Sequence, residues 1–224
     1  MHDKPLILVF VKAPIKGHIK SRLAASIGEE AAFALYKDFI CDVVDAVEKS
    51  GYPLRICFHP ANEKETVVSL LGSGYFLMPQ PSGDLGKKME HAFRWTFDEG
   101  FTRVLLIGSD IPDIPTPILR EALESLKEND IVIGPAADGG YYLIGFTKGS
   151  FFPQVFHGIP WGTKAVLDMT MHILEEASYR INLVATWQDV DTVDDLMSLF
   201  NRNRDTAFAQ SRTMKYIVKA RLHE

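Results

Sequence analysis

The sequence predicts an α/β fold with a mostly parallel central sheet flanked by helices. Residues 6–11 and 103–107 are apolar runs rich in β-branched side chains, which indicate strands buried on both faces. Along the whole chain, strand-like segments alternate with segments whose apolar residues recur at helical spacing. No repeat or Gly/Ser linker interrupts this alternation. We therefore expect one domain over residues 1–201, with a basic helical tail over residues 202–224 packed on it.

The expected elements follow in chain order, separated by turn residues. The expected strands after the first cover residues 54–58, 75–78, 103–107, 130–133, 140–146 and 181–185. The expected helices cover residues 29–49, 63–71, 85–97, 117–127, 163–177, 192–201 and 206–222. Thr116 is expected to cap a helix that has Pro117 at its first position, and Thr163 is expected to cap another. Thr192 and Asp195 resemble a capping box.

The composition describes an ordinary globular protein. The chain has 224 residues, of which 46% are hydrophobic and 24% charged, and this excludes a disordered protein, a collagen and a disulfide scaffold. No apolar run approaches the roughly 18 residues of a membrane span, so we expect no stable membrane insertion. No signal-peptide cleavage site follows the first strand. Cys41 and Cys57 are interpreted as buried thiols, and the expected location is a reducing cytoplasm.

The charge is unevenly distributed. The net charge is −5, which argues against a nucleic-acid partner. Residues 1–22 carry five basic side chains and one acidic, and residues 202–224 carry six and two, so each end has a net charge of +4. A local basic cluster on an acidic protein indicates a site for a small anion. Packing of the tail on the domain is the preferred interpretation, and contact with a membrane surface is the alternative.

The loop after the first strand carries four cations: Lys12, Lys16, Lys20 and Arg22. Ligands of open α/β sheets lie at the carboxyl ends of the strands, which is where this loop begins. Neither the dinucleotide-binding nor the Walker glycine pattern is present, so side-chain charges would have to hold phosphates. The alternative is a solvated basic loop.

A glycine-containing turn precedes the helix expected to begin at residue 85. Gly83 and Gly86 would allow a ligand to approach the backbone closely, beside the free N–H groups of the helix. Alternatively, the segment is only a strand–turn–helix connection in which Asp84 caps the helix.

Two aspartates are candidate metal ligands. Asp110 follows the central strand, where a hard oxygen ligand suits Mg²⁺ or Mn²⁺ bound to phosphates. Turn chemistry is the alternative for Asp110. Asp191, just before a helix, is a candidate second ligand, and helix capping is its alternative. The histidines show no zinc-ligand spacing.

Two further segments could line a pocket. Asp138, Gly139 and Gly140 lie between two expected strands, before Tyr141, where a simple hairpin turn is the alternative. Trp161, ahead of the helix expected at residue 163, belongs either to a pocket or to the core.

Together these motifs resemble the bacterial glycosyltransferase-A-like family first catalogued as a domain of unknown function, which includes arsenosugar-biosynthesis glycosyltransferases. The resemblance runs from about residue 6 to residue 199 and implies a single-domain nucleotide-diphospho-sugar transferase fold. More distantly, the sequence resembles molybdenum-cofactor and phospholactate guanylyltransferases. The motifs that carry the resemblance are Lys12-Ala-Pro, Gly17, Lys20-Ser-Arg22-Leu23, Gly83-Asp84-Leu85-Gly86, Gly108-Ser109-Asp110-Ile-Pro112, Gly134-Pro, Asp138-Gly139-Gly140-Tyr141, Trp161-Gly-Thr163, Asp191-Thr192 and Asp195-Leu196.

The resemblance and the residues themselves together predict roles for most of these motifs. The phosphate-binding loop would comprise Lys12, Ala13, Pro14, Gly17, Lys20 and Arg22. The base or ribose would approach Gly83, Asp84 and Gly86. The acceptor pocket would comprise Gly139, Gly140, Tyr141, Trp161 and Thr163. Asp110 and Asp138 would be catalytic, and Asp110 and Asp191 would bind the metal.

The expected function is therefore a transferase that uses Mg²⁺ or Mn²⁺, a nucleotide-activated donor and a small-molecule acceptor. Glycosyl transfer from a nucleotide-sugar is the first candidate. Nucleotidyl transfer from a nucleoside triphosphate to a phosphorylated acceptor, with release of pyrophosphate, is the second. A single aspartate stands at the strand tip where glycosyltransferases often have a D-x-D triplet, and this departure leaves the two candidates open. A non-catalytic nucleotide-binding module is a third candidate.

Overall fold

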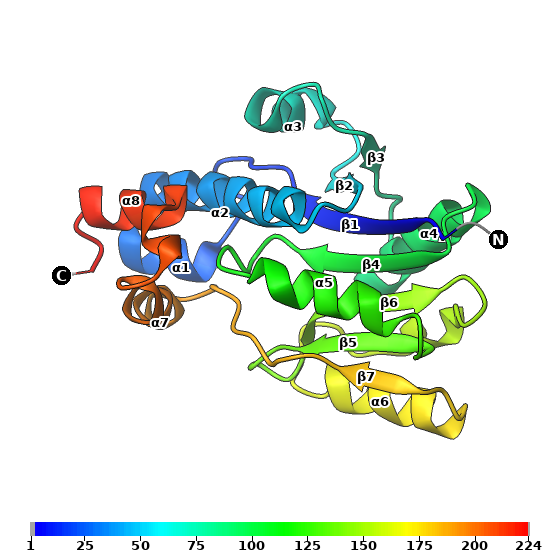
Figure 1. Ribbon diagram of the computed structural model, residues 1–224. Coiled ribbons are helices and arrows are strands. Elements are labelled where there is room, and N and C mark those ends of the chain that lie inside the picture. Colours follow the sequence, from blue (N-terminus) through cyan, green and yellow to red (C-terminus); the bar gives the residue numbers. More distant parts are fainter. Residues whose placement is uncertain (1–2, 224) are drawn as a thin grey trace.

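The computed structural model describes residues 3–223 and contains one seven-stranded sheet with helices on both faces (Figure 1). The strands are β1 (Pro5–Lys12), β2 (Leu54–His59), β3 (Leu77–Pro79), β4 (Arg103–Gly108), β5 (Ile131–Pro135), β6 (Tyr141–Thr147) and β7 (Ile181–Leu183). The helices are α1 (Ser21–Ile27), α2 (Glu29–Ser50), α3 (Lys64–Leu71), α4 (Leu85–Asp98), α5 (Thr116–Ser125), α6 (Val166–Glu176), α7 (Val193–Asn203) and α8 (Arg212–Lys219). Two short 3₁₀ turns cover Pro153–Phe156 and Ala207–Gln210.

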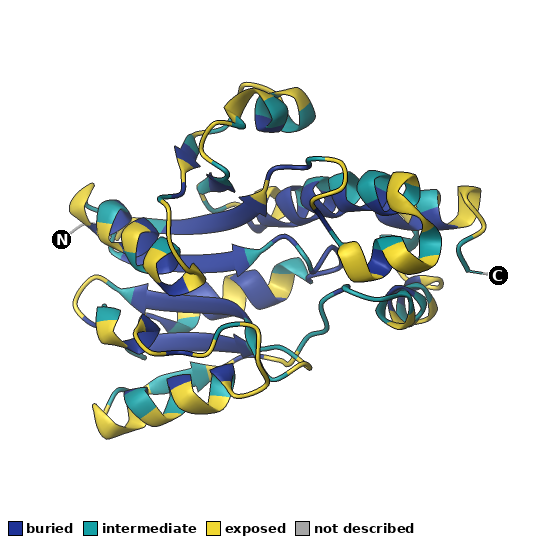
Figure 2. Cartoon of the chain, turned by 180° about the vertical axis from the view of Figure 1, so that it is seen from behind, coloured by how far each residue is buried: buried dark blue, intermediate teal, exposed yellow. Residues whose placement is uncertain are grey.

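The strand order is β3-β2-β1-β4-β6-β5-β7, and β6 alone runs antiparallel to its neighbours among these strands. This confirms the predicted mostly parallel sheet. Side chains of β1 alternate between the two layers: Ile7 and Val9 belong to the core with α2 and α5, and Leu8 and Phe10 to the core with α4 and α6. Figure 2 shows the strands as the buried centre between exposed helix faces. Burial on both faces explains the continuous apolar run of β1.

Two predicted helix starts are wrong. Helix α5 begins at Thr116, and its N-cap residue is Pro115. The Thr116 hydroxyl does not cap the helix and donates to the Ala46 carbonyl at 3.0 Å. Helix α6 begins only at Val166, because Thr163 lies in a turn and its hydroxyl donates to the Pro160 carbonyl at 2.9 Å.

Two other capping motifs are confirmed. The Asp84 carboxylate accepts the Lys87 N–H at 2.8 Å, and Thr192 with Asp195 forms a full capping box on α7. Residues 206–222 do not form the single helix that was predicted. They contain a 3₁₀ turn followed by the shorter helix α8. Helix α1, over residues 21–27, was not predicted.

Helix α8 packs along α2 (Figure 1), and helix α7 ends at Asn203, past the predicted domain limit at residue 201. The buried Asp42 carboxylate of α2 accepts the backbone N–H groups of Arg212 at 3.2 Å and Thr213 at 2.9 Å at the start of α8. These contacts attach the basic tail to the domain. Within residues 3–223, no helix is both long and apolar enough to cross a membrane.

The α2–α8 contact leads to a pH-dependent prediction. Burial raises the pKa of the Asp38 carboxyl to about 6, and the nearby charge of Asp42 adds to the effect. A raised pKa in the folded state means that the contribution of Asp38 to stability is present at low pH and is lost as the pH rises through about 6. The substitution Asp38→Asn, which mimics the protonated group, should therefore raise the melting temperature near pH 8, with a much smaller difference near pH 4. Equal differences at the two pH values would contradict this assignment.

Candidate functional site

The candidate site lies at the carboxyl ends of β1 and β4, where two cavities adjoin. The larger, of about 430 Å³, and the smaller, of about 200 Å³, share the lining residues Lys12, Tyr36 and Asp110. The Tyr36 hydroxyl contacts both strand ends, since it donates to the Lys12 carbonyl at 3.0 Å and lies 3.2 Å from the Ser109 hydroxyl. The fold therefore brings the basic loop and Asp110 together, as the strand-end rule predicts.

The smaller cavity contains a lysine between two aspartates. The Lys20 Nζ lies 2.6 Å from an Asp110 carboxylate oxygen and 2.8 Å from an Asp191 carboxylate oxygen. Arg22 lies 3.9 Å from the second oxygen of Asp191. Burial would lower the pKa of the Lys20 ammonium, but the two carboxylates outweigh burial and raise it. Lys20 is therefore a cation held by the two predicted metal ligands.

The approach of Asp191 to Asp110 has a backbone cause. The Val190 N–H donates to the Asp110 carbonyl at 2.9 Å, which fixes the segment before α7 beside the loop after β4. The capping contacts of α7 come from Thr192 and Asp195, so the Asp191 carboxylate is not used as a cap. Helix capping, the alternative interpretation of Asp191, therefore explains Asp195 but not Asp191.

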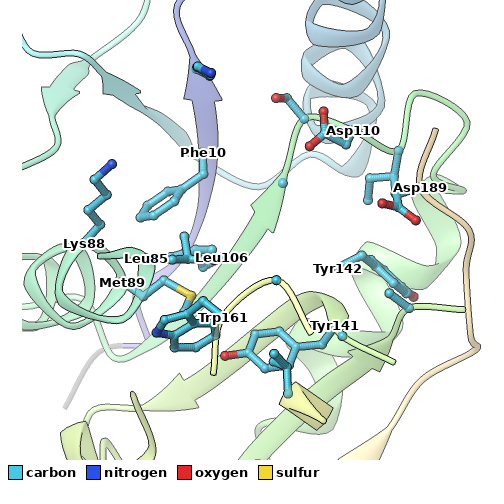
Figure 3. A pocket seen from close by; sticks show the side chains of 18 of the residues that line it. Phe10, Leu85, Lys88, Met89, Leu106, Asp110, Tyr141, Tyr142, Trp161 and Asp189 are labelled. Atoms are coloured by element: carbon cyan, nitrogen blue, oxygen red, sulfur yellow. The ribbon is translucent and has the colours of Figure 1, made fainter. Parts of the chain in front are cut away.

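The larger cavity has an acidic wall, a basic wall and an apolar floor. Figure 3 shows Asp110 and Asp189 on one side, Lys88 on the other, and Phe10, Leu106 and Trp161 between them. Burial raises the pKa of Asp189 to about 6, and the charges of Asp138 and Asp191 add to it. On the basic wall, burial together with the charge of Lys12 lowers the pKa of Lys88.

Several predicted site residues line these cavities: Lys12, Lys20, Arg22, Asp110, Asp138, Gly140, Tyr141, Trp161, Thr163 and Asp191. Gly139 is held at a φ of +93° beside the Lys164 backbone, and its carbonyl accepts the Leu167 N–H at 2.9 Å, so it shapes the turn. The Asp138 carboxylate accepts the Gly140 N–H at 2.9 Å in the same turn.

Other predicted residues lie beside the cavities without lining them. Ala13 and Pro14 are buried, whereas Gly17, Gly83 and Asp84 are exposed. Gly86 packs α4 closely, because a Cβ there would lie 2.5 Å from the Phe156 carbonyl oxygen and 3.0 Å from the Trp161 Nε1. Gly86 therefore positions the tryptophan of the cavity floor. The roles proposed for these residues in binding remain predictions.

Sequence reasoning assigned no role to Asp189, His59, Gln80 or Lys88, which also line the larger cavity. His59 and Gln80 stand at the carboxyl ends of β2 and β3, so the strand-end rule could have found them. Asp189 and Asp191 lie two residues apart before α7, and Asp189 lines the larger cavity whereas Asp191 lines the smaller one.

The donor chemistry of Asp110 and Asp191 fits a divalent cation. Carboxylate oxygens are the ligands that Mg²⁺ prefers, and Lys20 shows that both groups already converge on one cation. Across residues 3–223, no group of three carboxylate, histidine or cysteine side chains is arranged to hold a metal ion. A divalent ion would therefore take its remaining ligands from water and phosphate, as Mg²⁺ commonly does.

This fold is that of the nucleotide-diphospho-sugar transferases. A crystal structure from Desulfovibrio desulfuricans G20, provisionally described as such a transferase, is 38% identical, with a TM-score of 0.94 and 99% of each chain covered. Residues 43–163 match the family DUF2064, described as an uncharacterized protein conserved in bacteria, and the chain belongs to this family.

Two other relatives are more distant. The 2-phospho-L-lactate guanylyltransferase of Methanoculleus marisnigri is 24% identical over 184 residues, which cover 80% of this chain and 75% of the relative. The structure of Rv0371C from Mycobacterium tuberculosis H37Rv, in complex with manganese, is 16% identical, with a TM-score of 0.55 and coverage of 90% and 99% of the two chains. Both the predicted family resemblance and the predicted fold are confirmed.

Proposed function

We propose that this protein is a divalent-metal-dependent transferase acting on a nucleotide-activated donor, and that it transfers a nucleotidyl group. The observation that carries the proposal is the convergence of Lys12, Lys20 and Arg22 with Asp110 and Asp191 at one end of the sheet. Cations and a metal beside the phosphates stabilise the charge that develops during phosphoryl-group chemistry. The similarity to a guanylyltransferase supports nucleotidyl transfer, the candidate ranked second from the sequence.

In the proposed reaction, a phosphate oxygen of the acceptor attacks the α-phosphorus of a nucleoside triphosphate. The bond from the α-phosphorus to its bridging oxygen breaks, and pyrophosphate leaves. Lys12 and Arg22 hold the phosphates, and the apolar floor around Phe10 and Trp161 receives the organic part of the donor. A divalent ion at Asp110 and Asp191 would polarise the phosphate oxygens and neutralise their charge. The manganese complex of a structural relative supports this part of the proposal.

The contacts of Asp113 argue against a second metal ligand beside Asp110 in the loop after β4. Its buried carboxylate is bound by Arg202 at 2.7 Å, Asn203 at 2.6 Å and the Trp187 indole N–H at 3.0 Å. Asp113 therefore has no free oxygen for a metal, and Asp110 stands alone after β4. Glycosyl transfer is the second candidate, because the relative at 38% identity is described as a nucleotide-diphospho-sugar transferase.

A donor screen followed by product analysis tests this proposal. Nucleoside triphosphates and nucleotide-sugars are each added with Mn²⁺, and the melting temperature is measured; a ligand at 100 times its dissociation constant stabilises by about 2.7 kcal/mol. The active donor should be a triphosphate that releases pyrophosphate. Release of a nucleoside diphosphate from a nucleotide-sugar would show glycosyl transfer, and binding without turnover would show the non-catalytic module.

The basic loop gives a further prediction. We expect Arg22→Ala to weaken donor binding about tenfold or more, because a charge-assisted contact contributes about 1.5–3 kcal/mol. Calorimetric titration of wild type and variant measures the change. Lys16→Ala is the matched control, since Lys16 lies on the same loop but pairs with Glu30 and lines neither of the two cavities. Unchanged affinity in Arg22→Ala would show that this part of the loop is only a solvated surface.

A further inference from the structure

The side chain of Lys20 occupies an unusual position for a surface-loop lysine. It is only 5% exposed, although the loop around it carries the exposed Lys12, Gly17 and Arg22. Its ammonium contacts both Asp110 and Asp191 and lies 5.9 Å from the centre of the Tyr36 ring. A buried ammonium is stable only when carboxylates compensate its lost hydration. The two carboxylates therefore bind Lys20 as an internal cation.

The backbone of Lys20 is also fixed in this position. Its φ of 45° and ψ of 46° lie in the left-handed region, which is uncommon for a residue other than glycine, and it is the N-cap of α1. The loop thus turns sharply at Lys20, and the next residues begin the helix. This turn brings a loop lysine to within reach of aspartates that lie 90 and 171 residues further along the chain.

Asp110 and Asp191 cannot serve Lys20 and a divalent ion at the same oxygens. The Lys20 Nζ lies within 3 Å of one oxygen of each carboxylate, which is also where a cation that bridges these two oxygens would lie. Two cations at that separation would repel each other strongly, because the Lys20 side chain is only 5% exposed and poorly screened by solvent. Binding of the metal therefore requires the ammonium to leave.

We propose that Lys20 competes with the divalent cation for Asp110 and Asp191. As a consequence, the metal and the donor phosphates bind cooperatively, and each binds weakly in the absence of the other. This inference rests on the proposed function, because it concerns the same carboxylates. When the metal displaces Lys20, the ammonium loses two anionic partners and needs another. Phosphates in the same smaller cavity, which Lys12 and Arg22 also line, supply that partner. The displaced lysine therefore couples the two ligands, and such couplings are commonly about 5- to 150-fold.

The test is direct titration with Mn²⁺ alone, in which bound ion is measured by loss of the free-ion magnetic-resonance signal. We expect Lys20→Met to bind Mn²⁺ about tenfold more tightly than wild type, within the usual range of coupling free energies. Methionine keeps an unbranched apolar stem and removes the competing charge. The matched control is Lys16→Met, which removes an exposed lysine from the same loop and should leave the affinity unchanged. Added pyrophosphate should tighten Mn²⁺ binding in wild type much more than in Lys20→Met.

A second measurement needs only the wild-type chain, and so does not depend on folding of the variant. Lysine labelling with acetic anhydride, read by peptide mass spectrometry, should find Lys20 protected without metal and labelled when Mn²⁺ saturates the site. Lys16, with a side chain 53% exposed, should be labelled in both conditions. Pyrophosphate added with Mn²⁺ should protect Lys20 again.

Different failures separate the inference from the proposed function. Equal or weaker Mn²⁺ binding by Lys20→Met, or continued protection of Lys20 at saturating Mn²⁺, would overturn the competition and leave the metal-dependent transferase intact. If neither the wild-type protein nor Lys20→Met bound Mn²⁺, even with pyrophosphate present, the competition and the metal dependence would be overturned together.

Discussion

The substitution Asp110→Asn should abolish metal-dependent binding of the donor, and any transfer, while leaving the protein folded. Asp110 contacts the Lys20 cation at 2.6 Å and lines both cavities, so donor phosphates would lie beside its negative charge. Anionic oxygens repel a carboxylate unless a divalent cation lies between them. An amide of the same shape is a poorer metal ligand and carries no charge. Calorimetric titration of the donor with Mn²⁺ and with EDTA measures the loss.

The fold should survive this change because the Asp110 side chain is 48% exposed, and an amide oxygen at this position can still accept from the Lys20 ammonium. Lys20 also keeps Asp191 as a partner. Asp191→Asn should reduce donor binding in part. The account would be contradicted if Asp110→Asn bound the donor with wild-type affinity in Mn²⁺, or if the wild-type protein bound the donor equally well in Mn²⁺ and in EDTA. Either result would show that Asp110 only stabilises its own loop.

The second large effect is expected on stability. Asp113→Ala should lower the free energy of unfolding by about 3–5 kcal/mol, because it leaves the partly buried Arg202 guanidinium without its buried carboxylate partner. The carboxylate is 1% exposed and also accepts from the Trp187 indole N–H at 3.0 Å. For a chain of this size, the loss corresponds to a fall in melting temperature of about 10 °C.

Thermal unfolding measures this loss, and Asp205→Ala is the control. Asp205 is 89% exposed and pairs with Arg204 at 3.4 Å, so its removal should change little. Asp113→Ala should also weaken donor binding, because Asp113 connects the loop after β4 to α7 and to the segment that carries Asp189. An unchanged melting temperature would contradict the structural role assigned to Asp113.

The sheet was predictable because its signals are local. The run at residues 6–11 is apolar at every position, and the structure buries alternate side chains in two different cores. Thr192 and Asp195 likewise encode the start of α7 within four residues. Helix α1 was not predicted because it is only seven residues long and its N-cap is a lysine with a left-handed backbone conformation. Thr116 and Thr163 failed as caps because the N-cap positions of α5 and α6 are occupied by Pro115 and Ala165.

The candidate site was predictable only in part. Lys20, Asp110 and Asp191 each stood out through position, at a strand end or before a helix. Their mutual contact was not predictable, because Lys20 lies 90 residues from Asp110 and 171 residues from Asp191. The contact depends on the backbone hydrogen bond from Val190 to Asp110 and on the turn at Lys20. Asp113, three residues after Asp110, was assigned no role from the sequence, and its contacts with Arg202 and Asn203 are evident only in the structure.

The most direct test of the central claim is a crystal structure of the protein with Mn²⁺ and the donor identified by the thermal screen. The account predicts the ion at Asp110 and Asp191, and the donor phosphates at Lys12, Lys20 and Arg22. It also predicts that the organic part of the donor lies over Phe10 and Trp161. A complex with the phosphates bound elsewhere, and with Lys20 still between the two aspartates, would contradict it.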